Sequence, residues 1–150
     1  MDSRPVLICY DGSTHSERAI GEAAALFAPR HAVVLTVGPI MTFAESLTAT
    51  SSVVPGNAYD DLNKADAMQS AELGAEHARR AGLTAEARVE LSADTWYGIL
   101  TVADDIDAAA IVIGSHGVKS LRDRARGGVS RDVATHARRP VLIVPPAADS

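Results

Sequence analysis

The chain has 150 residues, of which 47% are apolar, 22% charged and 4% aromatic. This length and composition are typical of one globular domain, so residues 1–150 are expected to form a single domain. The net charge of −5 excludes the basic surface that nucleic-acid-binding proteins usually carry. A single cysteine, Cys9, excludes a disulfide scaffold and indicates a reducing compartment.

The start of the chain and its apolar segments bear on the compartment. Residues 1–5 lack the basic start and the long apolar stretch of a secretory signal. No apolar run approaches the ~18 residues that are needed to cross a bilayer. We therefore expect a cytoplasmic protein that does not enter the membrane.

The first part of the chain carries two strand signals with a helix between them. The continuous apolar run 6–10 predicts a strand that is covered on both faces. A polar turn follows, and Ser13 or Thr14 can cap the next helix, with Glu17 as the partner in a capping box. That helix ends before the next proline, and residues 32–37 predict a second buried strand.

A long polar connection at about 40–60 precedes the second helix, and its structure is left open. Gly82 ends this helix, which spans 59–81, and the alternation at 85–91 places the third strand near an edge of the sheet. The buried stripe of the helix is expected to be Leu62, Ala65, Met68, Ala71, Ala75 and Ala78. The rest of the chain predicts a helix at 96–103, a strand at 108–113, a helix at 127–137 and a strand at 141–144.

Strands and helices therefore alternate through the whole chain. This order predicts an open five-stranded parallel sheet with helices on both faces, a doubly wound, Rossmann-like α/β fold. In such sheets ligands bind beyond the carboxyl ends of the strands, at the point where the strand order reverses. The residues after the first and fourth strands are thus the candidates for a binding site.

Glycines gather at one of these places. Gly114 and Gly117 follow the fourth strand, and Gly127 and Gly128 open the last helix. Glycine lets the backbone approach a ligand, and a helix N-terminus adds unpaired N–H groups and a positive dipole end. Together these features predict a phosphate-binding site. The alternative is structural, because glycines also form tight turns and close helices.

These residues resemble the signature of the universal stress protein family. The family pattern is Gly-x2-Gly-x9-Gly-Ser/Thr with an aspartate at the end of the first strand. Residues 114–117 and 127–130 match the glycine pattern, and Asp11 matches the aspartate. The segment 139–144, which follows the glycine pattern in the chain, is also similar. The similarity extends from residue 5 to residue 145 in the order and length of the elements.

The resemblance to members that keep the glycine pattern implies that ATP binds, with Mg²⁺ as a further expectation. Asp11 would hold the ribose or the adenine side, Val37 would offer backbone hydrogen bonds to adenine, and Cys9 and Ile113 would flank the base. The ribose and phosphates would be wrapped by Gly114, Gly117, Gly127, Gly128, Val129 and Ser130. His116 faces a phosphate in one interpretation, and packs or meets water in the other.

One position departs from the family pattern. Gly128 stands where the pattern has Ser or Thr, so one hydroxyl donor to phosphate is missing. The loss is expected to cost on the order of 1.5–3 kcal/mol, unless Ser130 supplies a hydroxyl instead.

The resemblance implies a universal stress protein that acts as a nucleotide-responsive regulatory module in the stress response. It also implies a homodimer paired through residues 141–144, with an unidentified regulatory partner. The alternatives are a nucleotide-free dimeric interaction module and a slow ATP-hydrolysing enzyme. No catalytic residue is assigned, because only Asp11, His15 and His116 offer groups for hydrolysis. No metal-ligand spacing occurs, and Trp96 is expected to dock its helix or to serve an interface.

Overall fold

The computed structural model describes residues 2–40, 56–115 and 128–148, and its centre is a five-stranded sheet. All strands pair in parallel, in the order β3-β2-β1-β4-β5. The strands are β1 (Val6–Cys9), β2 (His31–Gly38), β3 (Thr84–Leu91), β4 (Ala110–Gly114) and β5 (Val141–Val144). The sheet is the one that the alternation of elements predicts, and β3 lies at an edge as its own alternation indicates.

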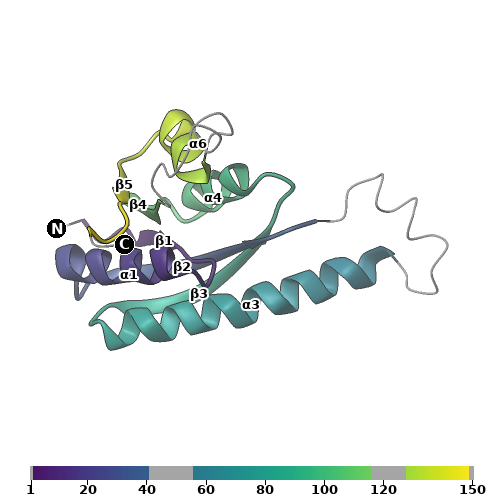
Figure 1. Cartoon of the computed structure of the whole chain (residues 1–150), viewed down its shortest axis with the longest axis horizontal. Helices are drawn as coiled ribbons and strands as arrows, with labels where there is room; N and C mark the ends of the chain where they lie inside the picture. The colour runs from purple at the N-terminus through teal and green to yellow at the C-terminus, as the bar shows by residue number, and fades with distance from the viewer. Residues whose placement is uncertain (1, 41–55, 116–127, 149–150) are drawn as a thin grey trace.

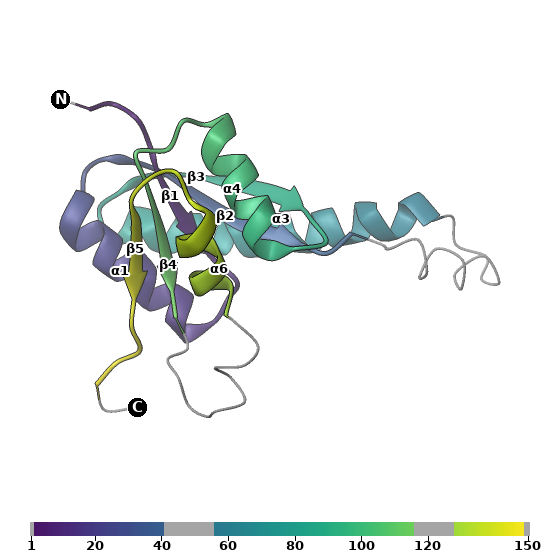
Figure 2. The same ribbon diagram turned by 90° about the horizontal axis from the view of Figure 1, so that it is seen from above.

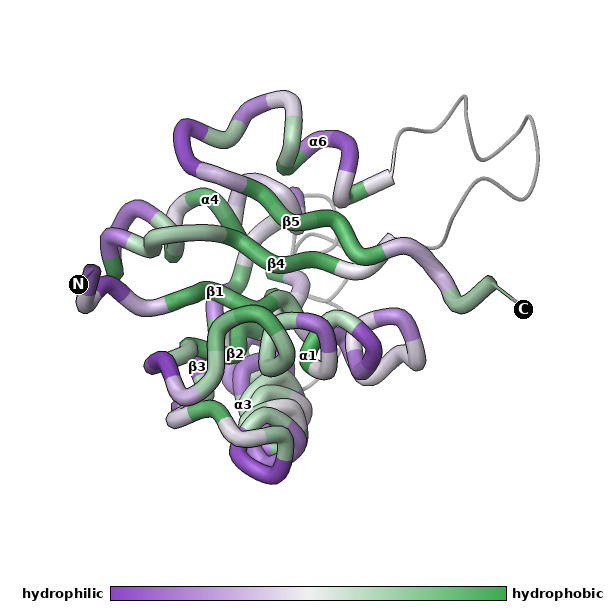
Figure 3. The backbone as a smooth tube through the Cα atoms, turned by 90° about the vertical axis from the view of Figure 1, so that its left-hand side faces the viewer, coloured by the Kyte–Doolittle hydropathy of each residue, from purple (hydrophilic) through white to green (hydrophobic). Residues whose placement is uncertain are grey.

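Helices cover both faces of this sheet (Figure 1). One face is covered by α1 (Thr14–Phe27) and α3 (Gly56–Arg80), and the other by α4 (Thr95–Asp105) and α6 (Val129–His136). Figure 3 shows the apolar strands between helices whose outward sides are hydrophilic. Within the described residues, no helix combines the length and the apolarity that a membrane crossing requires.

The strands are apolar on both sides because each side has its own core. Val6, Ile8 and Val34 belong to the cluster beneath α1 and α3. Leu7 and Leu35 belong to the cluster beneath α4 and α6. Successive strand residues point to opposite faces, so a sheet that is covered twice needs a continuous apolar run.

The cap of α1 differs in one respect from the sequence prediction. Ser13 is the N-cap, and its hydroxyl accepts a hydrogen bond from the Ser16 N–H at 3.2 Å. A capping box would have Glu17 accept from the Ser13 N–H, but that N–H donates to Asp11 Oδ1 at 2.9 Å. Glu17 instead lies with its carboxylate 3.8 Å from His77 Nε2 of α3. The predicted capping box is therefore wrong, because the preceding aspartate takes the donor.

The buried side of α3 differs in part from the predicted stripe. Ala71, Ala75 and Ala78 are buried as expected. Leu62 is 60% exposed and Met68 is 38% exposed, because the side of α3 that meets β2 there carries Ala67, which lies against Gly38. Ala65 is also exposed, and Ala67 is buried in its place.

Candidate functional site

The strand order reverses between β1 and β4. From β1 the chain proceeds outward to β2 and β3, and it then returns to β4 and β5 on the other side of β1. Ile8 pairs with Val112, so the segments that follow the two strands leave the sheet at neighbouring points. In open parallel sheets, ligands bind beyond the carboxyl ends of the strands at such a point. Asp11 follows β1 and Gly114 ends β4 there.

Three residues predicted to contact the base share one face of the sheet. Cys9 and Ile113 are 9% and 6% exposed, and both lie in the core cluster beneath α4 and α6. Val37 packs against the same cluster. These residues come from β1, β4 and β2, which are adjacent strands. They form an apolar floor near the carboxyl edge.

The thiol of Cys9 behaves as part of that floor. Burial, together with the negative charge of Asp11, raises the pKa of the Cys9 thiol to about 12. The thiol is therefore protonated at neutral pH, and it packs as a small apolar group rather than a nucleophile.

Asp11 begins the turn between β1 and α1, and its side chain is exposed. Its Oδ1 accepts the hydrogen bond from the Ser13 N–H, an interaction that fixes the carboxylate beside the first turn of α1. A held, accessible carboxylate at this edge can accept hydrogen bonds from the hydroxyls of a bound sugar.

Gly114 has a structural reason to be glycine. A β-carbon at this position would stand 2.5 Å from the carbonyl oxygen of His15 in the first turn of α1. The end of β4 and the start of α1 thus meet backbone to backbone. The close approach involves the protein's own chain, which is the structural alternative for this glycine, and a role in ligand binding is not required to explain it.

Unlike Gly114, the N-terminus of α6 has backbone groups without a partner in its own helix. Gly128 is the N-cap and makes no side-chain cap bond. The N–H groups of Val129 and Ser130 belong to the first turn, so no carbonyl within the helix accepts from them. Such an end attracts an anion through its N–H groups and the helix dipole. Figure 2 shows α6 beside β4, and Val133 of α6 lies in the same core cluster as Cys9 and Ile113.

The sequence motif also named His116, Gly117 and Gly127. These three residues lie outside the described residues. Among the groups that the structure describes, the floor and α6 share one face of the sheet, and Asp11 lies just beyond the carboxyl end of β1. Their chemistry suits a nucleotide: an apolar floor for a base, a carboxylate for a sugar and helix N–H groups for a phosphate.

Sequence reasoning missed a second feature, a cavity of about 280 Å³ between α4 and the end of α6. Trp96 was expected to dock its helix, and it does pack against the core cluster beneath α4 and α6. The stacking of Trp96 on His136 was not foreseen, because the two residues lie far apart in the chain. Adjacent aromatic residues in a chain that is only 4% aromatic were the available signal. The cavity is lined by Trp96, Tyr97, Leu100, Thr101, Asp104, His136, Arg138 and Arg139.

Comparison with known families identifies the chain. The family model described as "Universal stress protein family" matches residues 3–145. The chain belongs to the universal stress protein family. It is 30% identical over 149 residues to "Universal stress protein YxiE" of Bacillus subtilis (strain 168), an alignment that covers 93% of this chain and 97% of that protein.

Solved structures share the fold of this universal stress protein. The hypothetical protein MJ0577 matches with a TM-score of 0.74 and 19% identity, over 98% of this chain and 99% of that one. A universal stress protein in complex with cAMP matches with a TM-score of 0.69 and 24% identity, over 95% and 98% of the two chains. One from Archaeoglobus fulgidus in complex with dAMP matches with a TM-score of 0.63 and 23% identity, over 96% and 99%.

Proposed function

We propose that this universal stress protein binds ATP with Mg²⁺ at the carboxyl edge of its sheet, and that occupancy of the site regulates its contacts with a partner. The observation that carries the proposal is the strand reversal between β1 and β4, because Asp11 follows β1 and the uncapped first turn of α6 comes after β4 in the chain. The solved relatives in complex with cAMP and dAMP support a nucleotide as the ligand class.

In this proposal, different residues contact the base, the ribose and the phosphates of the nucleotide. Cys9, Val37 and Ile113 would contact the base, and Asp11 would accept hydrogen bonds from the ribose. The N–H groups of Gly128, Val129 and Ser130 would bind phosphate, with the Ser130 hydroxyl as a further donor. Gly114 would let the backbone run close to the ribose. His116, Gly117 and Gly127 are assigned on the sequence motif alone.

The phosphate end of this site is weaker than the family pattern predicts. Gly128 supplies an N–H but no hydroxyl, and Asp132 places a carboxylate in the first turn of α6. A carboxylate there competes with a phosphate for the positive end of the helix dipole. Bound Mg²⁺ would neutralise part of the phosphate charge. We therefore expect ATP to bind with a dissociation constant in the micromolar to sub-millimolar range, about −8 to −5 kcal/mol.

Calorimetric titration with ATP in the presence of Mg²⁺ tests the proposal. Asp11→Asn removes the charge but keeps an oxygen that can accept from the Ser13 N–H, so the turn is preserved. We expect this variant to bind ATP about tenfold more weakly. Asp61→Asn on the exposed side of α3 is the matched control and should bind as the parent does. The nucleotide-binding proposal would be refuted if ATP, AMP and cAMP at millimolar concentration gave no heat of binding. The protein used must release no nucleotide on denaturation, so that the site is known to be free.

The homodimer is a separate part of the proposal. β5 is an edge strand, and Ile143 on it is 40% exposed, so an apolar edge is available to a second copy. We expect Ile143→Asp to convert a dimer to a monomer in light scattering, while ATP binding persists. A parent protein that is monomeric at micromolar concentration would contradict this pairing.

A further inference from the structure

The cavity between α4 and the end of α6 has a wall of aromatic rings that are already held in place. The Trp96 indole stacks on the His136 imidazole, with centroids 4.4 Å apart and planes 21° from parallel. His136 Nδ1 lies 2.9 Å from the Asp132 carbonyl oxygen, which can only accept, so Nδ1 carries a proton. Tyr97 meets Trp96 edge to face at 5.8 Å and is itself 61% exposed.

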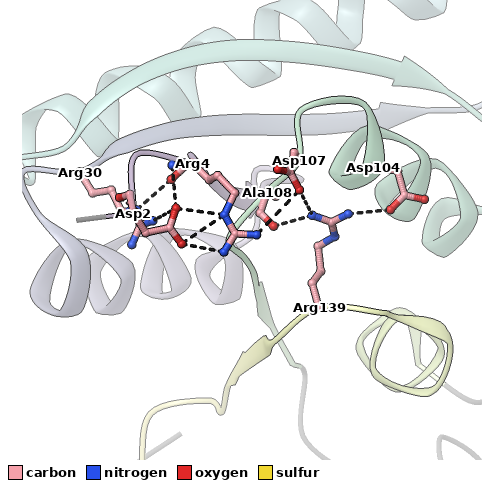
Figure 4. A network of polar contacts seen from close by, with 7 residues as sticks. All are labelled: Asp2, Arg4, Arg30, Asp104, Asp107, Ala108 and Arg139. Carbon is pink, nitrogen blue, oxygen red and sulfur yellow. Dashed lines mark hydrogen bonds and ion pairs between the residues drawn. The ribbon is translucent and has the colours of Figure 1, made fainter.

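The two arginines of the cavity differ in their partners. Arg139 is fully engaged: it donates to Asp104 Oδ1 at 2.8 Å and to the Ala108 carbonyl at 2.6 Å, and it pairs with Asp107 at 3.4 Å (Figure 4). Arg138 makes no ion pair or hydrogen bond with any residue that the structure describes. Asp104 and Asp107 both pair with Arg139, which leaves the exposed guanidinium of Arg138 available to a carboxylate from outside.

Size and composition indicate what such a cavity takes. Its volume of about 280 Å³ lies at or below the range of small-molecule sites, which is roughly 300–1,000 Å³. Trp, Tyr and Arg are the residues most enriched at the energetic centres of protein interfaces. An exposed Tyr97 next to a fixed Trp96 offers an anchor point for one large side chain, and Arg138 offers a partner for a carboxylate.

We propose that this cavity is a docking site for a segment of another protein that carries an aromatic or large aliphatic side chain next to an acidic residue. The apolar side chain packs against Trp96 and Tyr97, and the carboxylate pairs with Arg138. None of the residues that line this cavity is assigned to the proposed nucleotide site, so the docking proposal stands whether or not ATP binds.

Panning a displayed random hexapeptide library on the folded full chain tests the proposal. The double variant Tyr97→Ala/Arg138→Glu serves for counter-selection. Both side chains are exposed and Arg138 has no described partner, so the variant is expected to fold, and circular dichroism checks that it does. We expect enrichment of sequences with an apolar residue beside Asp or Glu. The proposal would be overturned if basic sequences were enriched, if no sequence were enriched, or if the enriched sequences bound the double variant equally well.

The affinity of one enriched peptide, made synthetically, can then be followed through Trp96, which is the only tryptophan of the chain. We expect Arg138→Glu and Tyr97→Ala each to weaken binding by about tenfold or more. Arg80→Glu, at an exposed site on α3, should change it less than about twofold. Equal affinities for Arg138→Glu and Arg80→Glu would contradict the assignment. Repeating the titration with saturating ATP separates this outcome from the outcome for the nucleotide site.

Discussion

The hydroxyl oxygen of Ser130 lies 3.9 Å from the point where a β-carbon on Gly128 would stand. Apart from the adjoining residues, no other heavy atom of the described chain lies within 4 Å of that point. The backbone angles of Gly128, φ −76° and ψ 159°, suit any L residue. Among the described residues, nothing therefore blocks the hydroxyl side chain that the family pattern has at position 128.

We expect Gly128→Ser to strengthen ATP binding by about ten- to a hundredfold, since one charge-assisted hydrogen bond contributes roughly 1.5–3 kcal/mol. The stability of the fold should rise by only a few tenths of a kcal/mol, because glycine is itself a tolerated N-cap. Calorimetric titration measures the first effect and urea unfolding the second. Gly128→Ala adds the β-carbon without the hydroxyl, so a gain in that variant would show that the hydroxyl is not the cause.

Gly114→Ala is expected to destabilise the protein in the absence of any ligand. Its β-carbon would press on the His15 carbonyl, and overpacking of this kind costs about 1–3 kcal/mol or more. Gly21→Ala in α1 is the control: apart from its own helix, no described atom lies within 4 Å of a β-carbon there, so removal of a helical glycine should stabilise by about 0.5–1 kcal/mol. Urea midpoints compare the two. An unchanged midpoint for Gly114→Ala would mean that the approach of α1 to β4 is not tight.

The buried thiol of Cys9 makes stability fall at alkaline pH. Its pKa is raised by burial from 9.0 to about 12, so the unfolded chain loses the proton first. The buried thiol therefore contributes fully to the free energy of unfolding below pH 9. This contribution is lost as the pH rises towards 12, at up to about 1.4 kcal/mol per pH unit. The free energy of unfolding, measured from pH 8 to 11 against Cys9→Ala, isolates this term from other titrating groups. Parallel curves would place the thiol in contact with water.

Substitution of the neighbouring residues Arg139 and Arg138 by alanine is expected to affect the stability of the fold very differently. Arg139 is 17% exposed, and its guanidinium ties the carboxyl end of α4 and the Ala108 carbonyl to the segment before β5. Arg139→Ala should therefore cost about 1–3 kcal/mol in urea unfolding. Arg138→Ala should stay within about 0.5 kcal/mol, because its side chain contacts no described polar partner. Equal losses in the two variants would mean that the Arg139 contacts do not stabilise the fold.

The sheet was predictable because each strand carries its own evidence. Continuous apolar runs such as 6–10 and 108–113 indicate cover on both faces, and the alternation at 85–91 indicates the edge, where β3 lies. Gly82 ends α3 as predicted: it has φ +107°, which favours glycine, and its N–H donates to the Arg79 carbonyl at 3.0 Å. These signals are local, so a single sequence contains them.

Predictions that depended on distant contacts were less secure. Helical spacing could not show that Ala67, rather than Leu62 or Met68, is on the side of α3 that meets β2. The motif indicated that Gly114 matters, but not that His15, about one hundred positions earlier, is what it touches. The stacking of Trp96 on His136 joins two helices whose relative position only the packed core determines.

The end of β4 and the first turn of α1 approach each other through main-chain atoms, since a β-carbon on Gly114 would stand 2.5 Å from the carbonyl oxygen of His15. Side chains elsewhere in the turn after β1 can be exchanged without changing this contact. Under the proposed function, substitutions at Asp11 or Ser130 would change which nucleotide binds while this backbone contact stays the same. Position 114 is the exception, because any larger residue there would press the first turn of α1 away from the end of β4.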